Sequence, residues 1–220
     1  AFAMSLDKRP IVETITRLGE RVAGHYVPPG SLPGYASPKG IGLDVAGAQR
    51  LLAEAGYPQG KGFPRIRLTY ATGAQHGDIA QQVRRQWLEN LGVDVELEPI
   101  ESAIFTARLH NREYELARAS WFGDYNDVST FTDKYLSSSD DNDAGWKNAE
   151  YDRLCDLAAR EPDQGKRLGM LSQAEQILLD EAPIIPVYYY VNKFMFRENV
   201  KGIALSPRNM IMFQAVEVVR

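Results

Sequence analysis

The feature that most constrains the fold of this chain is a strand–helix–strand pattern that occurs twice in succession. Residues 65–72 alternate between polar and apolar side chains, as in a strand with one buried face. Apolar residues then recur at helical spacing in 79–91, and the two-residue period returns in 93–97. A helical segment at 103–111 and a strand candidate at 115–121 repeat the pattern. Because such units pair in parallel through right-handed crossovers, the sequence predicts an α/β fold with a mixed β-sheet flanked by helices.

Further helices and strand candidates lie on both sides of this central region. Residues 26–42 are rich in proline and glycine, which predicts a loop. Asp44 is placed to cap a helix that reaches residue 55. The remaining candidates are helices at 149–160 and 164–180 and strands at 184–196 and 210–219. We expect the two helices to cover the sheet with their apolar stripes.

Composition excludes several classes of protein. The net charge is −4 and no basic run is present, so nucleic acid is not an expected partner. The longest apolar stretch, 182–191, is about half the length of about 20 residues that a membrane span needs. The single cysteine, Cys155, excludes an internal disulfide and says nothing about the redox compartment. The chain begins with Ala1 instead of methionine, and we expect it to be a piece of a longer protein.

Signals for catalysis, metals and cofactors are weak. The three histidines are far apart, and no paired Cys/His spacing predicts a transition-metal site. Residues 140–145 resemble the start of a calcium loop, but its fifth position is Ala144 and its twelfth is Tyr151, so a solvated acidic turn is favoured. Asp124 and Asp127 could act as a carboxylate pair in a hydrolase, although such pairs are common in polar loops. The sequence therefore predicts no metal and no cofactor, and leaves a hydrolase as the weaker alternative.

One loop carries the strongest functional signal. The segment Arg118-Ala-Ser-Trp-Phe-Gly-Asp-Tyr-Asn-Asp127 resembles the signature of the oligopeptide- and dipeptide-binding proteins of ABC importers, the family 5 extracellular solute-binding proteins. Other stretches are similar to hallmarks of the same family, in the same order: 1–12, 27–30, 51–64, 145–148 and 182–192. These matches cover nearly the whole chain, and their collinearity makes the resemblance specific.

The resemblance implies an architecture and a location. Complete members of the family are longer, and their two lobes are joined by a hinge and close over the ligand, as in type II-like periplasmic binding proteins. This chain resembles the second, C-terminal lobe: residues 1–198 would form the ligand-binding lobe, and 199–220 would return to the first lobe. The implied location is the periplasm or another extracytoplasmic space, with lipid anchoring left open. The implied partners are a short peptide and the membrane subunits of an ABC permease, and the implied state is a monomer without a membrane span.

The resemblance also implies which residues bind the ligand. They are Asp124, Trp121, Phe122, Arg118, His76 and Tyr125. Asp124 matches the aspartate that pairs with the ligand's α-ammonium, and the aromatic residues would line the cleft. Arg118 and His76 match positions that meet the peptide carboxylate. The alternatives are a turn-stabilising role for Asp124, core packing for Trp121, an ion pair for Arg118 and a helix-start role for His76.

Three departures from the family pattern limit this transfer. Ser102 stands where a cleft tryptophan is common, Leu109 stands where some members have a second arginine, with Arg108 adjacent, and Val128 replaces a proline. The predicted function is a receptor for short peptides and not an enzyme. A receptor for another solute, such as a nickel chelate, haem, an oligosaccharide or an opine, remains an alternative. So does a docking or sensory module for a membrane partner.

Overall fold

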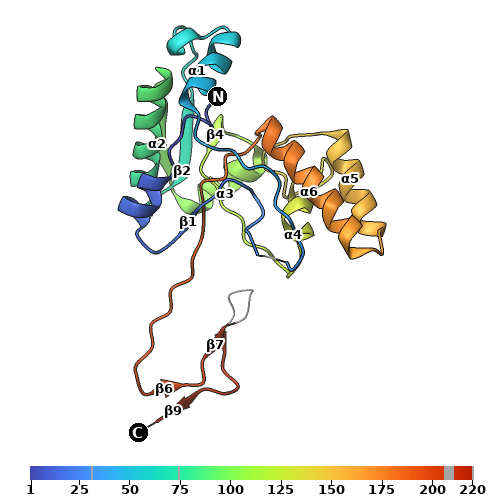
Figure 1. Cartoon of the computed structure of the whole chain (residues 1–220). Coiled ribbons are helices and arrows are strands. Elements are labelled where there is room, and N and C mark those ends of the chain that lie inside the picture. The colour runs from blue at the N-terminus through green and yellow to red at the C-terminus, as the bar shows by residue number, and fades with distance from the viewer. Residues whose placement is uncertain (31, 74, 206–210, 220) are drawn as a thin grey trace.

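The structure is a computed structural model of the chain and describes residues 1–30, 32–73, 75–205 and 211–219. Figure 1 shows a sheet with helices α1 and α2 in one part of the body and the helix pair α5 and α6 in another. The last segment of the chain leaves this body and extends well away from it. Among the described residues, no helix combines the length and the apolar character that a membrane crossing requires.

The central sheet has three strands in the order β3-β2-β4, and both of its strand pairs are parallel. The strands are β2 (Arg67–Ala71), β3 (Glu96–Ile100) and β4 (Leu116–Ala117), and the crossovers are α2 (His76–Leu91) and α3 (Ser102–Asn111). Leu68 lies opposite Leu97 on one side and opposite Leu116 on the other. The predicted α/β class and the predicted parallel pairing are therefore confirmed. Antiparallel pairs occur in separate two-stranded ladders.

The apolar stripe of α2 forms the main core together with the sheet. Ile79, Val83, Trp87 and Leu91 of this helix are all less than 10% exposed and pack with buried strand residues such as Leu68. Helix α1 (Val45–Glu54) adds Ala48 and Leu52 to the same core, and Asp44 caps it by accepting a hydrogen bond from the backbone N–H of Gly47 at 2.8 Å. Burying each large side chain contributes about 1.5–3 kcal/mol. This core fixes the position of the sheet edge described below.

The strands differ in position or length from those the sequence pattern predicts. The period-two pattern at 93–97 begins with Val93 and Val95, which are buried, but β3 has its five paired residues three positions later, from Glu96 to Ile100. The pattern at 115–121 yields only the two residues of β4, and 184–196 yields only β5 (Tyr188–Tyr189). The alternation of apolar residues reports which side chains are buried. A ladder also requires a neighbouring strand at the correct register, which a single sequence does not reveal.

Helices α5 (Ala149–Arg160) and α6 (Gln164–Glu181) match their predicted positions but not their predicted partner. They do not cover the sheet. Their buried residues form two clusters with the loop near Val27 and with the residues after Val128, and these clusters contain no strand residue among those described. An amphipathic stripe shows that a helix face is buried and leaves open against which element it is buried.

The remaining elements are short. They are η1 (Ile11–Thr16), β1 (Arg21–Val22), η2 (Pro58–Gly60), α4 (Ser129–Thr132), η3 (Asp133–Tyr135), β6 (Val200–Lys201), β7 (Ala204–Leu205), β8 (Ile211–Met212) and β9 (Glu217–Val218). β1 pairs with β5, β6 with β9 and β7 with β8, all antiparallel. The strand predicted at 210–219 thus appears as β8 and β9, and Met210 lies outside the described residues.

The N-terminus of α5 offers a first test of how the helix pair is held. The side chain of Asn148 accepts hydrogen bonds from the backbone N–H groups of Glu150 and Tyr151, both at 2.9 Å, and it also donates to Glu181. We expect Asn148→Ala to lower the free energy of unfolding by about 1 kcal/mol, because two helix N–H groups lose their acceptor. Urea denaturation followed by circular dichroism measures this loss. Asn148→Ser, which keeps a capping oxygen without placing a second negative charge beside Glu181, should retain most of the stability.

Candidate functional site

The candidate site lies where the parallel strands end. Because the strands are parallel, their carboxyl ends meet at one edge of the sheet, which is where α/β folds bind ligands. Arg118 follows β4 directly, and its backbone N–H donates to the carbonyl oxygen of Thr69 at 2.9 Å. His76 begins α2 after β2, and its Nδ1 lies 2.9 Å from the carbonyl oxygen of Ala71. The fold therefore places both predicted carboxylate-binding residues at the same edge.

The guanidinium of Arg118 contacts two tyrosines. Its Nη2 donates to the hydroxyl oxygens of Tyr188 at 3.2 Å and of Tyr190 at 2.5 Å. Among the described residues, no carboxylate lies within 4.0 Å of this guanidinium, so the structural ion pair considered for it is not formed. Burial raises the pKa of Tyr188 to about 12, so that phenol keeps its proton at neutral pH. The phenol oxygen accepts from Arg118 while its O–H can donate to an anion.

Trp121 and Phe122 differ in their surroundings. Trp121 is half-buried, its Nε1–H donates to the carbonyl oxygen of Thr130 at 2.8 Å, and the ammonium of Lys134 lies 4.4 Å from its ring centroid. Phe122 is 59% exposed, and its ring centroid lies 5.3 Å from that of Tyr190. Trp121 is thus held in place by its hydrogen bond to Thr130 and by the cation–π contact with Lys134. Phe122 instead presents an apolar surface to solvent.

Asp124 lies on an exposed turn that its neighbours hold in place. Its backbone N–H donates to the hydroxyl of Thr130 at 2.9 Å, and no side chain or backbone group in the described part of the chain binds its carboxylate. Gly123 packs so closely here that an added Cβ would lie 2.9 Å from Cγ2 of Thr130. The carboxylate is therefore not used to stabilise its own turn, and it remains available to a ligand.

The second carboxylate of this loop is committed to a structural contact. Asp127 accepts two hydrogen bonds from Arg167, at 2.6 and 2.9 Å, and one from the backbone N–H of Ser129 at 2.9 Å. Burial alone would raise the pKa of Asp127, but the bonds from Arg167 and Ser129 lower it below its usual value. A general acid needs a raised pKa, so Asp127 is unsuited to that role in a carboxylate pair with Asp124.

The remaining predicted residues have local partners. The hydroxyl of Tyr125 lies 3.1 Å from that of Ser129, and the side chain is 45% exposed. A carbonyl oxygen can only accept, so Nδ1 of His76 carries the proton, and Nε2 can donate to a carboxylate only when the imidazole is protonated. Arg108, the alternative to a second family arginine, donates to Glu98 at 3.0 Å. It is therefore less available to a ligand than Arg118.

The acidic turn at 140–145 already contains a cation. The ammonium of Lys134 donates to the carboxylate of Asp143 at 2.9 Å and to the carbonyl oxygen of Asp141. Among the residues that the structure describes, no cluster of three or more His, Cys, Asp or Glu side chains could hold a metal ion. The segment was predicted to be a solvated acidic turn. The structure instead buries Asn142 and pairs Asp143 with Lys134, so only part of the turn is solvated.

The structure adds residues that sequence reasoning did not assign to the site. Tyr188 and Tyr190 contact Arg118 from about seventy positions away in the chain, and Thr130 and Lys134 hold the loop that carries Asp124 and Trp121. The run of three tyrosines at 188–190 was the available signal, but it contributed only to the predicted fold and to the family resemblance, and not to the predicted site. No hydrogen bond or ion pair among the described residues joins His76 to Arg118.

Comparisons with known proteins identify the class of molecule. The structure has a parallel sheet with Arg118 and His76 at the edge where its strands end. One lobe of a two-lobed solute-binding protein has this kind of arrangement. The chain belongs to the bacterial extracellular solute-binding proteins, family 5, because the model of the middle part of that family matches residues 1–143. The family consists of solute-binding proteins.

Individual relatives agree with this assignment. The chain is 33% identical to the oligopeptide-binding protein OppA of Bacillus subtilis over 97% of its own length and 41% of that protein. A periplasmic oligopeptide-binding protein of Borrelia burgdorferi has a TM-score of 0.89 at 26% identity, over 99% of this chain and 44% of that one. Haemophilus influenzae OppA in complex with RPPGFSPFR has a TM-score of 0.86 at 27% identity, over 100% and 44%. The chain spans about two-fifths of the length of the curated relatives it matches.

Proposed function

We propose that this chain is the second lobe of an extracytoplasmic receptor that binds short peptides and delivers them to an ABC importer. The observation that carries the proposal is the exposed carboxylate of Asp124, which has no partner among the described residues and lies on the same loop as Trp121 and Phe122. A free peptide has an α-ammonium at one end, and a carboxylate is the charge-assisted acceptor that it needs.

A candidate partner for the carboxylate end of the peptide supports the same proposal. A guanidinium without a carboxylate partner, Arg118, lies at the carboxyl edge of the sheet with two phenols beside it. A receptor that accepts many sequences binds the charged ends and leaves the side chains in roomy pockets. Opposite charges at the two ends of one cleft would therefore fix the direction of the bound peptide.

A single lobe provides only part of this site. The proposed cleft closes when a first lobe, outside this chain, rotates over the ligand about a hinge, and the closed form is what the permease subunits recognise. Residues 199–220 would return to that first lobe. The position of the described residues in this range, 199–205 and 211–219, supports this role, because Figure 1 shows β6, β7 and β9 extended away from the body. The first lobe would then cover side chains that are exposed here on the C-terminal part of the chain, such as Met195 at 98% and Phe213 at 68%.

Calorimetry with tripeptides tests the two-lobe proposal. We expect the 220-residue chain to bind at least a hundredfold more weakly than the full-length receptor, because half of the ligand contacts and the exclusion of water are missing. The full-length protein, purified without denaturation and exchanged into ligand-free buffer, is the reference. Equal affinities of the two proteins would contradict the proposal.

A further inference from the structure

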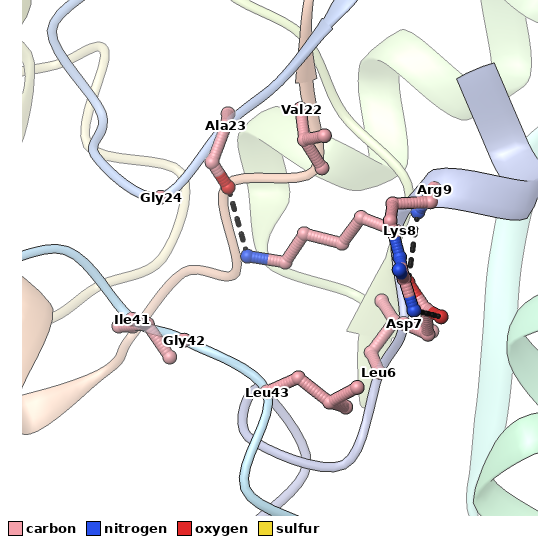
Figure 2. Close-up of a pocket in the computed structure, with 10 residues that line it drawn as sticks. All are labelled: Leu6, Asp7, Lys8, Arg9, Val22, Ala23, Gly24, Ile41, Gly42 and Leu43. Carbon is pink, nitrogen blue, oxygen red and sulfur yellow. Dashed lines mark hydrogen bonds and ion pairs between the residues drawn. The ribbon is translucent and has the colours of Figure 1, made fainter. Parts of the chain in front are cut away.

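A hollow of about 290 Å³ lies between three segments that are distant in the sequence (Figure 2). The segments are 6–9 before η1, 22–24 at the end of β1, and 41–43 before α1, and we call the space between them the Lys8 hollow. Figure 2 shows the stem of Lys8 extending across it, with the ammonium directed to the carbonyl oxygen of Ala23. None of the six predicted peptide-binding residues lines this hollow.

The charge of Lys8 is buried without compensation. Lys8 is 6% exposed and donates one hydrogen bond, to the carbonyl oxygen of Ala23 at 2.8 Å. No carboxylate of the described residues lies within 4.0 Å of its ammonium. The neighbouring carboxylate of Asp7 is occupied by Arg9, whose Nε and Nη2 donate to it at 3.0 and 2.7 Å. Burial lowers the pKa of Lys8 to about 8, as expected for an ammonium without a counter-charge.

A second lysine shows how the fold treats a buried ammonium elsewhere. Lys134 is also 6% exposed, but it is paired with the carboxylate of Asp143 at 2.9 Å and lies over the ring of Trp121. Buried charges are normally paired in this way, because an isolated ion is costly outside water. The two lysines have the same exposure, and Lys8 differs in having an open hollow where Lys134 has a carboxylate.

The chemistry of the hollow defines what it can hold. Asp7, Lys8 and Arg9 are its titratable lining residues, and together they carry one net positive charge. The other two segments contribute only Val, Ala, Gly, Ile and Leu. A water molecule takes about 30 Å³ in the liquid, so the volume admits an ion of several heavy atoms. We propose that the Lys8 hollow binds a small oxyanion, such as a carboxylate or inorganic phosphate, whose charge compensates the Lys8 ammonium.

Lysine NMR tests this proposal on the unmodified chain. The protein is labelled with ¹³C and ¹⁵N in lysine only, the Cε resonance of Lys8 is assigned with Lys8→Arg, and its titration is followed with acetate, with phosphate and with chloride at equal ionic strength. An anion at tenfold its dissociation constant should raise the titration midpoint of Lys8 by about one pH unit, because it binds the charged form. At fixed pH, the Cε chemical shift of Lys134, which is already paired with Asp143, should not respond to the added anion.

Two variants provide an independent measurement. We expect acetate or phosphate to raise the Tm of the wild type and of Lys61→Met, an exposed surface control, and to have no such effect on Lys8→Met. The proposal is wrong if neither anion moves the Lys8 midpoint beyond the chloride reference, or if all lysines shift equally. If Lys8→Met does not fold, the titration of the wild type decides alone. Peptide binding is not involved, so this outcome is separate from that of the proposed receptor function.

Discussion

Asp124→Asn in the full-length receptor should weaken the binding of a tripeptide by about ten- to a hundredfold. The substitution keeps the shape of the side chain and removes the charge that would meet the α-ammonium, and hydrogen bonds to charged groups contribute about 1.5–3 kcal/mol. The turn should survive, because its contacts use the backbone N–H of residue 124 and the hydroxyl of Thr130 instead of the carboxylate. Isothermal titration calorimetry measures the change.

A tripeptide with an acetylated N-terminus, which has no α-ammonium, completes a double-mutant cycle with Asp124→Asn. If Asp124 meets the ammonium, acetylation should weaken binding to the wild type and have little further effect on Asp124→Asn, since the same interaction is removed twice. Asp140→Asn, in the exposed acidic turn, is the control and should leave affinity unchanged. Unchanged peptide affinity of Asp124→Asn would refute the role of Asp124 as the partner of the α-ammonium. A wild-type receptor that binds no tripeptide would refute the peptide assignment and favour a different solute.

The parts of the fold that were predictable from sequence are those with long periodic segments. Helices α2, α5 and α6 begin and end within a few residues of the expected positions, because a stripe of apolar residues over three or more turns identifies both the element and its buried face. The partner of that face was not predictable. Helices α5 and α6 pack on loops, and only the three-dimensional arrangement reveals those loops as a surface.

The candidate site divides in the same way. A contiguous motif predicted Trp121, Phe122 and Asp124 together, since residues on one short loop are close in space in any fold. The contact of Arg118 with Tyr188 and Tyr190 joins segments about seventy residues apart, and no local pattern encodes it. Lys134 and Asp143 are close in sequence, yet their ion pair was not predicted, because the acidic turn was compared only with metal sites.

The largest effect on stability is expected at Glu175, a buried carboxylate on α6. This side chain is 0% exposed and accepts hydrogen bonds from the backbone N–H groups of Tyr26 and Val27, both at 2.7 Å, and from the hydroxyl of Tyr35 at 2.5 Å. It therefore holds the proline- and glycine-rich loop against the helix pair. Removing a partner of buried donors costs about 1–3 kcal/mol for each group left unpaired.

Glu175→Ala should accordingly lower the free energy of unfolding by about 3–5 kcal/mol, because three donors lose one acceptor and a cavity remains. Glu175→Gln should cost far less. Its amide oxygen can accept from both backbone N–H groups, and its NH₂ can donate to the phenol oxygen of Tyr35. Urea denaturation of both variants and of Gln173→Ala, an exposed position on the same helix, measures the difference. A loss for Glu175→Gln as large as for Glu175→Ala would show that the charge, and not the hydrogen-bond pattern, holds the loop.

The pH dependence of the stability of the wild type and of Glu175→Gln shows whether the charged or the protonated form of Glu175 stabilises the fold. Burial raises the pKa of Glu175 above its usual value of 4.5, although the hydrogen bonds from Tyr35, Val27 and Tyr26 act in the opposite direction. A raised pKa means that the folded protein binds the proton more tightly than the unfolded chain. The stability that this proton contributes is complete below pH 4.5 and is lost as the pH rises through the folded-state pKa. Glutamine has no such proton, so the advantage of the wild type over Glu175→Gln should be largest in acid and should shrink towards neutral pH. An advantage that grows with pH would instead mean that the bound carboxylate is the stabilising form.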